Sequence, residues 1–142
     1  MKTKPNEKIS IVICSKNSYN DVLFHLQNTD SYKVGEVLFV TNCKDEINVI
    51  TKHIGKYKTP ISLVQDDGTG VGQARAKGLA KVTKEYLIFL GPDNRIDSDS
   101  ITKIFNQLKE PLALKRNPSE NLKRHFDAYY LTPLMVRSIF EN

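Results

Sequence analysis

The chain has 142 residues, 39% of them hydrophobic and 26% charged, which fits a single globular domain with one core. No apolar run approaches the ~20 residues of a membrane span, and the lysine-rich start lacks the apolar segment of a signal peptide, so we expect no transmembrane segment and a cytoplasmic location. The net charge of +5 suits a solvated basic face or a small phosphate-bearing ligand. Because basic residues are not interleaved with aromatics as in a nucleic-acid-binding module, no nucleic acid is expected as a partner.

Short apolar runs alternate with segments of helical periodicity through the first three quarters of the chain. The predicted strands are Ile9–Cys14, Glu36–Val40, Ile61–Val64 and Tyr86–Leu90. Four helices are predicted. The first is capped by Ser18 or Asn20 and has Val22, Leu23 and Leu26 on one face, and the second begins at Asp45 and has Ile47, Ile50 and Ile54 on one face. The third covers Gln73–Val82, and the fourth is capped by Asp97, Ser98 or Asp99 and has Ile101, Ile104, Phe105 and Leu108 on one face. This alternation predicts an α/β fold with a mainly parallel sheet.

The predicted sheet indicates where a ligand would bind. Sheets of this kind bind ligands beyond the carboxyl ends of their strands, at the point where the strand order reverses. For the order 3-2-1-4, the reversal lies between the first and fourth strands, and the loops there are Cys14–Asn17 and Gly91–Asn94. General topology therefore places Asp93 at the expected ligand crevice.

The pattern weakens after Lys109. The expected elements there are short strands at Leu112–Leu114 and Ala128–Leu131, a mobile basic loop over Asn117–Arg124 and a helix over Pro133–Phe140. We therefore predict a single domain over residues 1–142, with a ligand-binding core over 9–108 and a short extension over 109–142.

A glycine-rich stretch, residues 66–72, connects the third predicted strand to the third helix. It does not follow the first strand and no G-K-[S/T] follows it, so it is neither a dinucleotide fingerprint nor a P-loop. Glycines allow close backbone approach and N–H groups at a helix start attract anions, but taken alone a flexible turn is the simpler explanation. Arg75, on the first turn of the helix, could grip a phosphate or carboxylate, or be a solvated charge.

The turn after the fourth strand contains Asp93 and Asn94. A carboxylate beside an amide at the carboxyl end of a strand can bind a hard divalent cation that bridges diphosphate oxygens. An Asp-Asn pair is also common in turns that bind nothing, and the pair alone does not decide between the two.

Cysteines and histidines give no metal or catalytic motif. Cys14 and Cys43 lie near the ends of apolar runs and are expected to be small buried residues. His25 and His53 fall on the first two helices, His125 falls in the basic segment, and ordinary structural positions are expected for all three.

Four segments together resemble family 2 glycosyltransferases, in the order and spacing of that family. Ile9–Asn17 is similar to the opening strand of the family and Glu36–Val40 to its second strand. Asp67–Leu79 resembles the loop and helix of pattern G-x-x-x-A-R-N-x-G, and Tyr86–Asn94 resembles the strand that runs into the D-x-D metal motif. The resemblance covers Ile9 to about Leu108 and implies the nucleotide-sugar-binding half of a GT-A fold, a Rossmann-like sandwich that is short at its C-terminus.

The resemblance also implies roles for particular residues. Ser15 and Asn17 would lie near the nucleotide base, and Asp67 and Arg75 near the base or the diphosphate. Asp93 would take the place of the last D-x-D aspartate, which binds Mn²⁺ or Mg²⁺ in the family. The metal would stabilise the charge that develops on the leaving nucleoside diphosphate.

The chain departs from the family pattern at several positions. Gly91 stands where the first D-x-D aspartate is expected, so the motif is only D-x-D-like. Thr41 and Asn42 replace a pair of aspartates, although Asn42 could still hydrogen-bond a base edge, and Ala76 replaces an asparagine. The sequence ends before the region where the family places its general base, and Glu120 and Asp127 are candidates by position only.

Three functions remain open. The first is a metal-dependent sugar transferase that uses a UDP- or GDP-sugar and an unknown acceptor. The second is a catalytically inactive or partner-dependent nucleotide-sugar-binding module, and an exposed sheet edge could pair with another copy of the chain. The third, ranked last, is a nucleotidyltransferase, which would need a glycine-rich basic loop after the first strand, where this chain has Ser15–Ser18.

Overall fold

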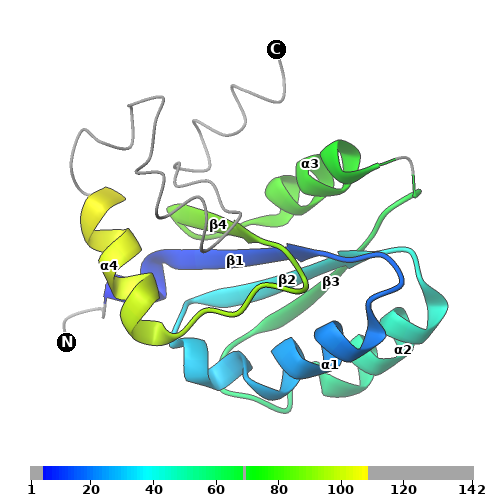
Figure 1. Ribbon diagram of the computed structural model, residues 1–142, viewed down its shortest axis with the longest axis horizontal. Coiled ribbons are helices and arrows are strands. Elements are labelled where there is room, and N and C mark those ends of the chain that lie inside the picture. Colours follow the sequence, from blue (N-terminus) through cyan, green and yellow to red (C-terminus); the bar gives the residue numbers. More distant parts are fainter. Residues whose placement is uncertain (1–4, 69, 109–142) are drawn as a thin grey trace.

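The structure is a computed structural model that describes residues 5–68 and 70–108. Its centre is a parallel sheet of four strands in the order β3-β2-β1-β4 (Figure 1). The strands are β1 (Ile9–Cys14), β2 (Glu36–Thr41), β3 (Ile61–Gln65) and β4 (Tyr86–Leu90). The predicted strand order is confirmed, and β2 and β3 each extend one residue beyond the predicted end.

Helices cover both faces of the sheet. They are α1 (Tyr19–Gln27), α2 (Lys44–His53), α3 (Val71–Lys81) and α4 (Ser98–Leu108), with short 3-10 helices η1 (Pro5–Lys8) and η2 (Thr29–Tyr32). Figure 1 shows α1 and α2 below the sheet and α3 above it, while α4 lies near the amino-terminal end of the chain. Asp97 caps α4, because its carboxylate accepts the backbone N–H of Ser100 at 2.8 Å.

Each face of the sheet contributes one apolar layer, because successive strand residues point to opposite sides. On the α1–α2 side, Ile11, Ile13 and Phe39 pack with Val22 and other residues of the helices. On the α3 side, the layer contains Val12, Leu38, Val40, Ala74, Leu79, Val82, Leu87 and Phe89. The near-continuous apolar sequence of β1 is explained by this two-sided burial.

The predicted inner face of α2 is wrong in part. Its buried residues are Glu46, Val49 and Ile50, whereas Ile54 follows the helix and is 46% exposed. The reason is that the Glu46 carboxylate bonds to groups at the ends of β1 and β2, which turns this side of the helix inwards.

The predictions for residues 109–142 lie outside the described residues. They comprise the strands Leu112–Leu114 and Ala128–Leu131, the loop Asn117–Arg124, the helix Pro133–Phe140, and the positions of Glu120, His125 and Asp127. Among the described residues, no helix combines the length and apolar character that crossing a membrane requires.

Candidate functional site

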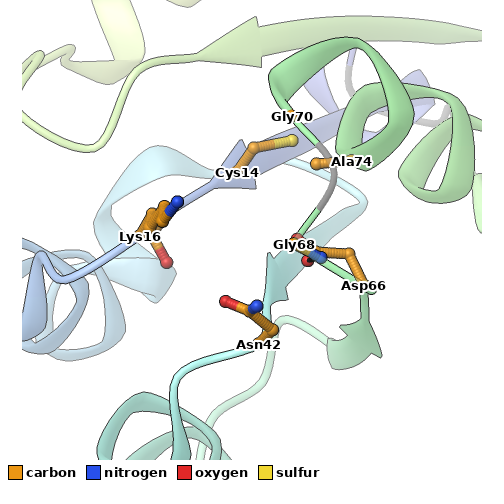
Figure 2. Close-up of a pocket in the computed structure, with 8 residues that line it drawn as sticks. Cys14, Lys16, Asn42, Asp66, Gly68, Gly70 and Ala74 are labelled. Carbon is orange, nitrogen blue, oxygen red and sulfur yellow. Dashed lines mark hydrogen bonds between the residues drawn. The ribbon is translucent and has the colours of Figure 1, made fainter.

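The carboxyl ends of the strands surround a pocket of about 140 Å³ (Figure 2). It is lined by Cys14, Ser15, Lys16, Asn42, Asp66, Gly68, Gly70 and Ala74. Figure 2 shows Cys14 pointing towards Ala74, with Asn42 and Asp66 on the other side of the opening. Pockets that enclose a whole small ligand usually measure roughly 300–1,000 Å³, so this one can enclose only part of a nucleotide.

The glycine-rich loop forms one wall of the pocket. Gly68 has a φ of +74° and Gly70 a φ of +132°, backbone conformations that side chains strongly disfavour. Asp66 closes the turn by accepting the Gly68 N–H at 2.6 Å. A Cβ atom at Gly68 would collide with the amide nitrogen of Asn42, so this glycine lets the two loops touch.

A buried carboxylate holds the opposite wall. Glu46 is only 1% exposed, and its Oε1 accepts the hydroxyls of Ser15 at 2.5 Å and Thr41 at 2.8 Å. Its Oε2 accepts the backbone N–H of Ser18 at 2.6 Å. Glu46 therefore joins the ends of β1 and β2 to the start of α1, and it fixes the orientation of the Ser15 side chain in the pocket.

Asn17 lies next to the pocket and is not part of its lining. Its backbone has a φ of 56°, in the left-handed region. Its N–H donates to the Cys43 sulfur at 3.2 Å, and the Cys43 thiol donates to the Asn17 side-chain oxygen at 3.3 Å. The loops after β1 and β2 are thus connected at the surface as well as through Glu46.

The two residues that the resemblance placed near the base or the diphosphate, Asp67 and Arg75, occupy different positions. Asp67 is exposed and pairs with Lys77 at 3.7 Å, while its neighbour Asp66 lines the pocket. Arg75 is half-buried, with its guanidinium carbon 5.4 Å from the centre of the Phe89 ring. A guanidinium over an aromatic face is held by cation–π attraction, which limits its freedom to move.

Cys14 is half-buried at the edge of the pocket, where the sequence predicted a buried residue. Burial raises the pKa of its thiol to about 12, an effect that the Arg75 charge opposes and the Asp66 charge reinforces. Both charges therefore act at the pocket, even though Arg75 is not among its lining residues. The thiol is neutral at physiological pH and is not a nucleophile there.

The loop after β4 is held from α1. His25 is fully buried, and its Nε2–H donates to the Pro92 carbonyl at 2.8 Å. Its Nδ1 therefore lacks a proton and accepts the Tyr32 hydroxyl at 2.6 Å. Burial lowers the pKa of His25, and burial raises the pKa of Tyr32 to about 12, so both groups are neutral.

Arg95 provides a second connection between this loop and α1. Its guanidinium donates to the Pro92 carbonyl at 2.9 Å and pairs with Asp21 at 2.8 Å. It also lies 4.0 Å from the centre of the Phe24 ring. The contacts with Asp21 and Phe24 could not be predicted from the sequence, since these two residues lie about seventy positions before Arg95 in the chain.

Asp93 is exposed on the same loop and does not line the pocket. In the described part of the chain, no three His, Cys, Asp or Glu side chains are grouped so as to hold a metal ion. A single carboxylate nevertheless fits Mg²⁺, which usually takes one or two protein carboxylates and completes its shell with phosphates and water.

Comparison with known proteins agrees with the architecture. The sequence profile of glycosyl transferase family 2 matches residues 10–129, and no curated protein matches the chain. The S. aureus TarS 1-349 structure is 17% identical with a TM-score of 0.59, and the match covers 71% of this chain and 32% of TarS 1-349. A complex of the same protein with UDP-GlcNAc matches equally well, with 17% identity, a TM-score of 0.59, and coverage of 71% and 31%.

A second type of protein shares the fold. The 4-diphosphocytidyl-2C-methyl-D-erythritol synthase of Anaerococcus prevotii is 19% identical with a TM-score of 0.60, covering 72% of this chain and 51% of the synthase. At this level of identity the structural matches show the fold alone, and they confirm the expected GT-A-like α/β fold. The chain spans about a third to a half of the length of these proteins.

Proposed function

The chain belongs to glycosyl transferase family 2, and from this premise we propose that it binds a nucleotide-sugar and transfers the sugar to an acceptor. The observation that supports the proposal is the pocket at the carboxyl ends of the strands, which Ser15 and Asn42 line. Parallel sheets bind ligands at the carboxyl ends of their strands. This pocket lies beside β1, β2 and β3, and the loop after β4, where the order of the strands predicted the crevice, does not line it.

In this proposal the pocket takes the nucleotide base. Its volume of about 140 Å³ suits one ring system better than a whole nucleotide. Asn42 is exposed at the opening and offers both an amide donor and an acceptor to a base edge. Ser15 donates its only hydroxyl proton to Glu46, so it can only accept a hydrogen bond from the ligand. Asn17 lies beside the opening and would contact the base or ribose from outside.

The diphosphate would lie between the glycine-rich loop and the loop after β4. Arg75 supplies a positive charge on one side, and Asp67 would contact the ligand only after leaving Lys77. Asp93 would hold Mn²⁺ or Mg²⁺, which when bound supplies positive charge for the leaving diphosphate. His25 and Arg95 hold the backbone of this loop and so orient Asp93.

The alternative is a nucleotide-sugar-binding module that does not catalyse transfer, or that needs a partner chain. The motif around Asp93 favours it, since Gly91 replaces the first aspartate and leaves one carboxylate on the turn. The general base and the acceptor site stay unassigned in both versions. The cytoplasmic location and the pairing of two copies remain predictions.

Calorimetric titration with UDP and GDP, with and without Mn²⁺, tests the proposal. We expect Mn²⁺ to strengthen nucleotide binding, and we expect Asp93→Ala to abolish this strengthening. Asp99→Ala makes the same change of charge at an exposed residue of α4 and should leave the effect of Mn²⁺ unchanged. Asn42→Ala should weaken binding whether or not the metal is present. A folded chain that binds neither nucleotide would contradict the proposal.

A second assay separates transferase from binding module. The protein is incubated with Mn²⁺ and a nucleotide-sugar that it binds, and the release of nucleoside diphosphate is measured. Release that Asp93→Ala abolishes supports catalysis, whereas tight binding without release supports the module.

A further inference from the structure

A second cleft lies at the opposite end of the sheet, where the strands begin. It measures about 410 Å³ and is lined by Glu7, Lys33, Val34, Gly35, Lys58, Thr59, Pro60 and Lys84. These residues precede β1, β2, β3 and β4, so four separate connections meet there. A strand of five or six residues spans roughly 17–20 Å, which separates this cleft from the pocket at the carboxyl ends.

The charge of the cleft is strongly positive for its size. Lys33, Lys58 and Lys84 line it together with one carboxylate, that of Glu7. Among the described residues, none of the three ammonium groups forms an ion pair. Three like charges around one cleft repel one another, and an anion between them would relieve that repulsion.

Two other acids near the cleft, Asp30 and Glu36, bind backbone groups beside it. Asp30 accepts the backbone N–H groups of Thr59 at 2.9 Å and Lys58 at 3.3 Å. Glu36 is buried and accepts the N–H of Thr83 at 2.8 Å and its hydroxyl at 2.9 Å. Both acids hold backbone in place, and the charge of Asp30 also acts on Lys58 and offsets part of its positive charge.

Backbone geometry positions two of the lysines. A Cβ atom at Gly35 would collide with the carbonyl oxygen of Glu7 and would lie 2.7 Å from Cε of Lys84, so the stem of Lys84 packs against this glycine. Lys33 has a φ of 55°, a left-handed conformation that is uncommon for a residue with a side chain. The cleft is therefore a defined feature of the fold, where the side chains are directed by local backbone contacts.

We propose that this cleft is an anion site, distinct from the nucleotide pocket, that binds a ligand carrying at least two phosphate groups. Lysine ammonium groups bind phosphate as point charges and need no fixed fork geometry. The volume of about 410 Å³ falls in the range of roughly 300–1,000 Å³ in which ligand pockets lie. Among the described residues that line the cleft, none has an aromatic ring to stack on a base, so the ligand is recognised by its phosphates and not by a nucleobase.

Pyrophosphate is the probe for the test, and the amide resonances of the full chain are followed by NMR at low salt. We expect shifts at Lys33–Gly35 and Lys58–Thr59 and near Lys84. Lys33→Gln, Lys58→Gln and Lys84→Gln should each weaken binding about fivefold, the factor expected for one unit charge at about 4 Å in water. Lys16→Gln, the same change in the nucleotide pocket, is the matched control and should leave this binding unchanged.

The same variants distinguish a free ligand from a lipid headgroup. Phosphatidylcholine vesicles with and without cardiolipin, a lipid whose headgroup carries two phosphates, are tested by co-sedimentation. Binding only to the anionic vesicles, lost in the Lys33, Lys58 and Lys84 variants and retained in Lys16→Gln, would support the site with a headgroup as ligand. The proposal fails if neither probe binds, or if Lys16→Gln weakens binding as much as the cleft variants do. Thermal unfolding of each variant confirms that it is folded.

Discussion

Replacing Glu46 by alanine should destabilise the chain and disorganise the pocket together. Glu46 accepts hydrogen bonds from Ser15, Ser18 and Thr41, each of which lies at the end of a strand or the start of a helix beside the pocket. Ser15 is 6% exposed and Thr41 is 0% exposed, so water cannot readily replace the lost acceptor.

The size of the effect follows from these bonds. A hydrogen bond to a charged group contributes about 1.5–3 kcal/mol, so three of them amount to at least about 4.5 kcal/mol. Alanine also removes the cost of burying the carboxylate, which offsets part of the loss. We therefore expect the free energy of unfolding to fall by about 3–4 kcal/mol. A domain of ordinary stability, about 5–15 kcal/mol, would still fold.

Glu46→Gln is the informative comparison. Its side-chain oxygen can accept the Ser18 N–H, and its NH₂ group can donate to the hydroxyl oxygens of Ser15 and Thr41 once those hydroxyls turn. Every polar group then keeps a partner and only the charge is lost, so the cost should be about 1–2 kcal/mol. Asp45→Ala, an exposed acid in the same helical turn, should cost about 0.5 kcal/mol.

Urea unfolding of the three variants gives these values, and nucleotide titration of each reports on the pocket. The reasoning would be refuted if Glu46→Ala cost no more than Asp45→Ala. It would also be refuted if Glu46→Gln were as damaging as Glu46→Ala, since that would mean the charge and not the bonding pattern is required.

Three further results are expected. Burial lowers the pKa of His25, so the imidazole binds a proton more tightly in the unfolded chain than in the folded one. The free energy of unfolding should therefore fall by up to about 1.4 kcal/mol per pH unit as the pH drops below about 6.5. This pH dependence should be absent from His25→Gln and persist in His53→Gln. Gly78→Ala should lower the free energy of unfolding by about 1–2 kcal/mol, because its Cβ would lie 2.7 Å from a side chain of β1, whereas Gly72→Ala, with open space around it, should raise it by up to about 1 kcal/mol, both measured in urea. Cys14 should react with iodoacetamide at pH 8 far more slowly in the folded than in the unfolded chain, as followed by mass spectrometry of its peptide, because burial raises its thiol pKa to about 12; equal rates would contradict its burial.

The strands could be predicted because they depend on local signals, whereas their order is a non-local property that comes from the resemblance to the GT-A fold. Each strand is a short apolar run, and parallel strands joined by helices leave few topologies. The same rules place Ser15 and Asn42 at one edge of the sheet, where both line the pocket. Asn17 and Asp93, which the same reasoning places at this edge, do not line the pocket, and the binding roles of all four residues stay predictions.

The remaining site residues depend on side-chain direction, which the pattern does not contain. Asp66 lines the pocket while Asp67 faces Lys77, and the turn at Gly68 decides which of these neighbours points inwards. Glu46 could not be predicted, since an acid in the first turn of a helix is ordinarily exposed and interacts with the helix dipole. Only the packing of α2 against the sheet reveals that this glutamate is buried.

These contacts divide the pocket into walls that differ in how firmly they are held. Buried hydrogen bonds hold two of its loops, because Glu46 bonds to Ser15 and Ser18 after β1 and to Thr41 at the end of β2. The connection after β3 has a bond from Asp66 to Gly68 and an exposed ion pair with Lys77, contacts that water can replace at low cost. A ligand that needs more room than the pocket offers would therefore displace the glycine-rich side, since moving either of the other loops would break buried hydrogen bonds.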